Sequence, residues 1–165
     1  MDSRKINPIE RAECAKAHFQ QGYNCAQAVA LAFADITTLD KHTIATITAP
    51  FGGGMGRLRE VCGAVSGMSF LVGFIAPSPT ADNGEAKKEN YALVQHFAEQ
   101  FRHQNGAIVC RTILGLDRPK DEPTPSERTA EYYKKRPCAD LVYDAALIVG
   151  EYLANGKLKT ESGEL

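Results

Sequence analysis

The sequence lacks the features of several common classes of protein. It has 165 residues and a net charge of −1, from 19 Lys and Arg against 20 Asp and Glu, so no strong field attracts nucleic acid or an anionic membrane. No apolar run is long enough to cross a bilayer, and the first ten residues carry no apolar segment typical of a secretory signal. We expect a cytoplasmic protein that neither binds nucleic acid nor inserts into a membrane.

Familiar catalytic and ligand-binding motifs are missing as well. No HExxH, no P-loop ending and no Ser-His-Asp signature occurs, and the glycine-rich stretch 52–56 does not complete a GxGxxG pattern. No CxxC occurs either, which argues against a thioredoxin-type motif and against a zinc ribbon. His18 follows Cys14 by four residues, so the pair could share a helical face and hold a metal, or both could be solvated surface residues.

Strand pairs and hairpin turns are also absent from the pattern, whereas apolar residues recur at helical spacing. Asn24 and Asp40 are expected to cap helices, and Asp82 with Glu85 forms a capping-box pattern. Expected helices cover 8–21, 24–35, 40–51, a stretch ending near 74, one from 82 to 105, 107–115 and 137–153; the segment 40–51 also suits a strand. We predict an all-α, single-domain bundle of five to six helices over 1–165, with a core at about 8–155, a long exposed loop at 117–129 and a frayed tail at 157–165.

The five cysteines are the unusual part of the composition. Four of them fall near predicted helix N-termini: Cys25, Cys62, Cys110 and Cys138. Unpaired N–H groups and the partial positive charge at such an end favour a thiolate, which is both the nucleophile and the metal ligand. Basic residues close in sequence to Cys62 and Cys138 strengthen the expectation of a lowered pKa. The alternative is that all five thiols simply pack in a helical core.

Glycines surround one of these cysteines. Gly53, Gly54 and Gly56 precede Cys62, and their backbone could approach a cysteine site closely or hold an anion, together with Arg57. Gly63 and Gly67 lie four residues apart on one helical face, where they would admit another helix or a cofactor. These six residues are the candidate cofactor-binding set.

The segment from Phe51 to Arg57, followed by Val61 to Gly67, resembles the core of the family named putative redox-active protein, C_GCAxxG_C_C. Asn24-Cys25-Ala26-Gln27, Cys110 and Cys138 match the remaining cysteine positions, although this chain has Cys62-Gly63 where the family name writes Gly-Cys. The resemblance implies a small helical domain with a redox role, and it leaves Cys14 outside the four family cysteines.

Three hypotheses follow. In the first, the four cysteines act in thiol–disulfide exchange or electron transfer, with Cys62 as the most reactive thiolate, so that the protein is an oxidoreductase or an electron carrier. In the second, the same four cysteines hold an iron–sulfur cluster or another soft metal. In the third, the chain is a non-redox helical interaction protein. The redox partner is unknown, and homodimerisation is left open.

Overall fold

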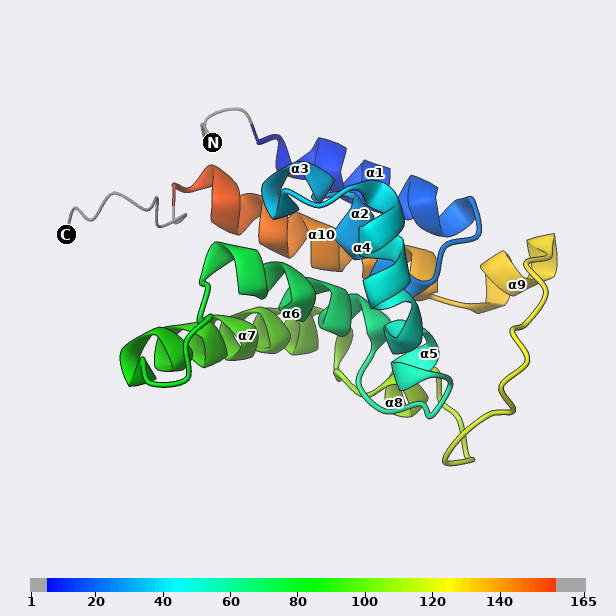
Figure 1. Ribbon diagram of the computed structural model, residues 1–165. Helices are drawn as coiled ribbons and strands as arrows, with labels where there is room; N and C mark the ends of the chain where they lie inside the picture. The colour runs from blue at the N-terminus through cyan, green and yellow to red at the C-terminus, as the bar shows by residue number, and fades with distance from the viewer. Residues whose placement is uncertain (1–5, 157–165) are drawn as a thin grey trace.

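The computed structural model describes residues 6–156, and the predicted tail at 157–165 lies outside these residues. The chain is 67% helical, and the described part contains no strand beyond one antiparallel bridge between Val61 and Val109. The all-α single-domain prediction is confirmed, and six helices have seven residues or more, with shorter ones raising the total above five to six. The helices are α1 (Pro8–Gln20), α2 (Cys25–Leu31), α3 (Ala34–Thr37), α4 (Lys41–Thr48), α5 (Gly52–Met55), α6 (Gly63–Ile75), α7 (Gly84–Asn105), α8 (Cys110–Ile113), α9 (Ala130–Lys135) and α10 (Cys138–Ala154) (Figure 1).

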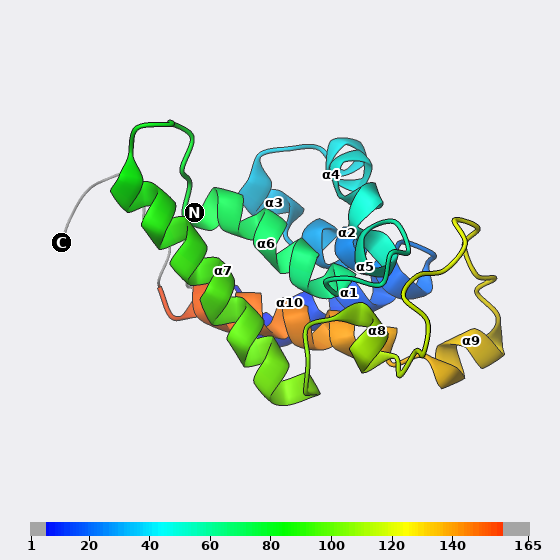
Figure 2. The same cartoon turned by 90° about the horizontal axis from the view of Figure 1, so that it is seen from below.

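The bundle is built around α1, α2, α6 and α10. The helix α1 lies along α10, α2 packs against α1 and α6, and α7 covers the outer side of α6 and α10 (Figures 1 and 2). The residues fully buried between them include Phe19, Val29, Met68, Phe101 and Leu153. No helix within residues 6–156 combines the length and the apolar character that a membrane crossing requires.

Several helix ends follow from local sequence. Asn24 and Asp40 cap α2 and α4 as predicted, and Gly106 ends α7 with a left-handed φ of 84°. The predicted capping box at Asp82 is wrong by one residue, because the side chain that accepts the N–H of Ala86 belongs to Asn83. Neither the helix predicted at 107–115 nor the one at 24–35 has its expected length, since the first covers only Cys110–Ile113 and the second ends at Leu31.

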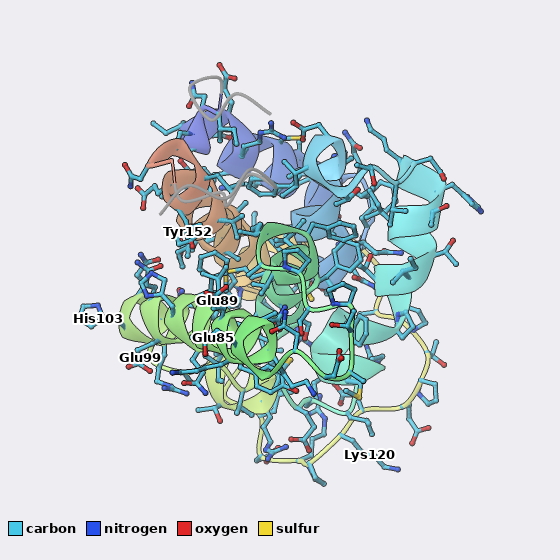
Figure 3. The ribbon with its side chains drawn as sticks, turned by 60° about the vertical axis from the view of Figure 1, so that its left-hand side comes forward. Glu85, Glu89, Glu99, His103, Lys120 and Tyr152 are labelled. Atoms are coloured by element: carbon cyan, nitrogen blue, oxygen red, sulfur yellow. The ribbon has the colours of Figure 1, made fainter. Side chains whose placement is uncertain are left out.

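The segment 117–129 is irregular, as predicted, and leads into α9, a helix that the sequence pattern did not indicate. It runs along the end of the bundle where α5, α8 and the first turn of α6 lie (Figures 1 and 2). Lys120 lies on the outer side of this segment and points away from the helices (Figure 3). The opposite side of the segment, from Pro123 to Arg128, faces a cavity.

Candidate functional site

Four cysteines from four separate helices line one cavity of about 370 Å³. Cys25, Cys110 and Cys138 are the first residues of α2, α8 and α10, and Cys62 is the N-cap of α6. All four are free thiols. The predicted positions at helix starts are therefore met, and the fold brings together residues that lie up to 113 positions apart in the sequence, from Cys25 to Cys138.

Cys14 takes no part in this cavity. It lies in the middle of α1 with its side chain exposed, and its Sγ is 3.6 Å from Nε2 of His18. Within residues 6–156, no group of three or more His, Cys, Asp or Glu side chains has the arrangement that holds a metal ion.

Local backbone contacts hold the cysteines at their positions. The side chain of Asn24 accepts the N–H of Gln27, the Gln27 side chain accepts the N–H of Asn24, and this capping box fixes the start of α2 at Cys25. On the other side of the cavity, the N–H of Cys62 donates to the carbonyl of Ile108 at 2.8 Å. The N–H of Cys110 donates to the carbonyl of Glu60 at 2.6 Å, so two backbone hydrogen bonds join the residues before α6 to the residues at the start of α8.

Two glycines allow backbone to approach the sulfurs. A Cβ on Gly63 would lie 2.4 Å from Sγ of Cys25, and a Cβ on Gly54 would lie 2.7 Å from Cβ of Cys110. Gly54 also has a left-handed φ of 70°, which only glycine adopts without strain. The expected close approach of glycine backbone to the cysteine site is therefore present at these two positions.

The other members of the predicted cofactor-binding set have different surroundings. Gly53, Gly56, Arg57 and Gly63 line the cavity. Gly67 does not, because it faces α2, where a Cβ would lie 2.9 Å from the carbonyl oxygen of Ala26 and from Cβ of Val29. Gly67 thus allows close packing of α2 and α6. The N–H groups from 56 to 60 all donate to carbonyls of residues 50–55, so of the three predicted loop glycines Gly56 does not offer its N–H to an anion.

Arginines form much of the remaining wall, and one of them, Arg128, was not indicated by the sequence. Arg57, Arg59, Arg128 and Arg136 line the cavity. Arg59 is the most buried: its Nε and Nη2 donate to Asp121 at 2.8 and 2.7 Å, and its Nη1 lies 3.6 Å from Sγ of Cys110. Because Asp121 belongs to the segment 117–129, this one guanidinium joins that segment to a site cysteine. Proximity in sequence to Cys62, for Arg57 and Arg59, and to Cys138, for Arg136, was the signal for the other three.

The sequence model of the family described as putative redox-active protein (C_GCAxxG_C_C) matches residues 23–152, which is more than half of the chain. The chain belongs to this family. All four cavity cysteines of this C_GCAxxG_C_C protein lie within the matched residues, and Cys14 lies outside them. No curated protein and no solved structure matches the chain.

Burial reverses the pKa expected for the cysteines of this C_GCAxxG_C_C chain. It raises the pKa of Cys62 well above its usual value, and it raises the pKa of Cys138 to about 12. The pKa of Cys110 is also raised by burial, but the hydrogen bond from Arg59 acts in the opposite direction. The expected lowering is wrong because the partial charge at a helix start is weaker than the loss of hydration in this cavity. Burial of Cys62, which is only 5% exposed, therefore disfavours the thiolate form that the sequence predicted for it.

Cys25 has a central position among the sulfurs. Among the cysteine neighbours of Cys62, Cys110 and Cys138, it has the largest effect on the pKa, and in each case a charge on Cys25 raises it. Such coupling requires Cys25 to lie within electrostatic reach of the other three thiols.

A second cavity, of about 380 Å³, is lined by no cysteine; Glu89 and Tyr152, labelled in Figure 3, are among its residues.

Proposed function

We propose that this protein is a thiol redox protein whose four cavity cysteines form and break disulfides with a disulfide-containing partner. The observation that carries the proposal is the convergence of Cys25, Cys62, Cys110 and Cys138 on one cavity from four separate helices. Packing alone does not account for this arrangement, because the cysteines border open volume rather than filling it. Whether the exchange makes the protein an enzyme or an electron carrier depends on the partner.

The chemistry uses two protein thiols for each partner disulfide. A thiolate of the cavity attacks one sulfur of the partner disulfide, which forms a mixed disulfide and releases one partner thiolate. A second cavity cysteine then attacks the mixed disulfide, so that a protein disulfide forms and the second partner thiolate leaves. Two electrons pass to the partner, and the protons of the two protein thiols end on the two partner thiolates.

We assign the first attack to Cys110 and the second to Cys25. Cys110 has a guanidinium donor 3.6 Å from its sulfur, which stabilises the thiolate against the cost of burial. Cys25 lines the same cavity as the other three cysteines and is the cysteine that most affects their pKa values, so we take it as the resolving residue. This assignment replaces Cys62 as the opening nucleophile.

The test is a thiol count on the full chain, treated first with a reductant and then with a small disulfide such as oxidised dithiothreitol or cystamine. We expect the wild type to lose thiols in pairs and to recover them on reduction. Cys14→Ser serves as the matched control and should lose the same pairs, whereas Cys25→Ser should lose at least one pair fewer. Absence of any reversible loss in the wild type contradicts the proposal.

A second candidate function is binding of an iron–sulfur cluster by the same four cysteines. The observation that favours it is that all four cavity cysteines are free thiols, the residue type that is deprotonated on binding a soft metal. Four thiols around one cavity suit the donor set of a cluster. No arrangement for a single ion exists among residues 6–156, whereas a cluster spaces its ligands farther apart. The bound cluster would supply one-electron transfer.

This candidate is tested on protein purified without oxygen. Iron, sulfide and the broad visible absorption of a cluster are expected in the wild type and in Cys14→Ser, and are expected to fall in Cys25→Ser. A colourless, metal-free preparation that retains all four cavity thiols would rule out the cluster and leave thiol exchange as the remaining redox function.

A further inference from the structure

The wall of the cysteine cavity carries a surplus of positive charge. Four guanidinium groups line it, and no Asp or Glu of residues 6–156 does so. Asp121 is the carboxylate that pairs with these arginines, and it is shared between Arg59, Arg118 and, at 3.7 Å, Arg57. With the thiols protonated, as burial favours, one carboxylate faces more cations than it can balance.

Two of the four lining arginines, Arg57 and Arg136, have no carboxylate of residues 6–156 within hydrogen-bond distance, since Asp121 is 3.7 Å from Nη2 of Arg57 and pairs more closely with Arg59. Arg57 donates to neutral groups, the carbonyl of Glu122 at 2.7 Å and Oγ of Ser126 at 3.4 Å. Arg136 forms no ion pair within residues 6–156, and its guanidinium carbon lies 5.8 Å from the ring centre of Tyr132. Burial, then the charge of Arg59, lower the pKa of Arg57, and Arg136 adds a smaller repulsion. Both guanidinium groups line the same cavity, where an anion between them would reduce this repulsion.

Arg128 has a structural explanation instead. It donates to the carbonyls of Phe19 and Tyr23 at 3.1 and 3.2 Å, and its guanidinium carbon lies 4.3 Å from the ring centre of Phe19. These contacts join the segment 117–129 to the end of α1. The backbone N–H groups of residues 56–60 are also occupied, so these five do not compete with the arginine side chains for an anion.

We propose that the cavity binds a small molecule through an oxyanion or carboxylate group held between Arg57 and Arg136, next to the sulfurs of Cys110 and Cys138. The proposal rests on the proposed thiol function and names the class of its partner: a small anionic disulfide rather than a protein. A volume of about 370 Å³ admits a molecule of that kind, and guanidinium groups match the planar geometry of a carboxylate or the face of an oxyanion.

The experiment uses the full chain, reduced and metal-free, and measures the melting temperature during titration with sodium sulfate and, separately, sodium malonate. Sodium chloride of equal ionic strength is the reference for non-specific salt effects. We expect a saturable rise in melting temperature with at least one of the two anions. Arg136→Gln should lower the affinity for that anion at least tenfold. Arg102→Gln removes the same charge from an exposed ion pair with Glu99 on α7 and should leave the affinity unchanged.

Circular dichroism and the melting temperature without anion establish that Arg136→Gln is folded. A rise no greater than that in chloride, or an equal loss of affinity in both variants, overturns the inference. Its failure is separable from that of the proposed function, because the thiol count is made on the same preparations. If thiols are lost reversibly in pairs but no anion binds, thiol exchange remains the proposed function and its partner is neutral or macromolecular.

Discussion

The glycines of α6 provide a prediction in which three similar substitutions have three different outcomes. Gly63, Gly67 and Gly73 all lie in one helix, and each is changed to alanine. At Gly73 the new Cβ meets nothing within 4 Å. At Gly67 it meets a backbone carbonyl oxygen and a Cβ at 2.9 Å, and at Gly63 it meets Sγ of Cys25 at 2.4 Å.

The expected change in the free energy of unfolding depends on whether the neighbouring atoms can move away from the new methyl group. Gly73→Ala gains helix propensity and should stabilise the fold by about 0.5–1 kcal/mol. Gly67→Ala forces α2 and α6 apart, which costs about 1–3 kcal/mol, and the same propensity offsets only part of this. Gly63→Ala can be relieved by rotation of the Cys25 sulfur, although the carbonyl of Phe51 at 3.0 Å still crowds the new methyl. We expect a net loss of about 1 kcal/mol or less in stability, but a displaced sulfur.

Two assays separate these effects. Urea denaturation, read by linear extrapolation, gives the free energy of unfolding for each variant. The rate of protein disulfide formation with a small disulfide reports the position of Cys25. We expect Gly67→Ala to lower stability with little change in that rate per folded molecule, and Gly63→Ala to change the rate with little loss of stability. If Gly67→Ala were as stable as Gly73→Ala, or Gly63→Ala exchanged like the wild type, the close packing described for α2 and α6 would be refuted.

Three further predictions concern the groups around the cavity. Asn24→Ala removes the cap of α2 and should lower the free energy of unfolding by about 1 kcal/mol, measured in urea, whereas Gln21→Ala, at the exposed end of α1, should change it far less. The pKa of Cys138 is raised to about 12 in the folded chain but is near 8.5 when unfolded. The contribution of this thiol to the free energy of unfolding should therefore be fully present below about pH 8 and be lost as the pH rises toward 12. A pH series of melting temperatures checks this, and a flat profile would contradict it. Arg59→Gln should raise the pKa of Cys110 further and Asp121→Asn should lower it, because the two groups act on that thiol with opposite signs; the pH dependence of Cys110 alkylation distinguishes them, and shifts of the same sign would exclude the link.

Local sequence rules predicted those parts of the fold that depend on neighbouring residues. Asn24 and Asp40 cap helices because a short polar side chain can reach an N–H two or three residues along the chain. The same rules placed the four site cysteines at helix starts. The helix predicted at 24–35 fails for a long-range reason: Arg11 of α1 donates to the carbonyl of Ala32 at 2.8 Å and pairs with Asp35, where α2 gives way to α3.

The charged part of the site could not be predicted from spacing. Arg59 and Asp121 are 62 residues apart, and their contact depends on how the segment 117–129 crosses the end of the bundle. The predicted direction of the thiol pKa shifts was wrong for a related reason. Position at a helix start is a local property, whereas burial depends on every element that closes the cavity, including Arg57, Pro123 and Tyr132.

The charge at a helix start and the charge of a nearby arginine affect the pKa values of the site cysteines in different ways. A helix start offers roughly half an elementary charge, and all four cysteines receive it, so it cannot make one thiol more reactive than another. The guanidinium of Arg59 lies 3.6 Å from Sγ of Cys110, and its charge also lowers the pKa of Cys138, but it pairs with Asp121 of the segment 117–129 as well. Without the Asp121 carboxylate, the full charge of Arg59 would face Cys110 and lower the pKa of that thiol, which is the direction expected for Asp121→Asn.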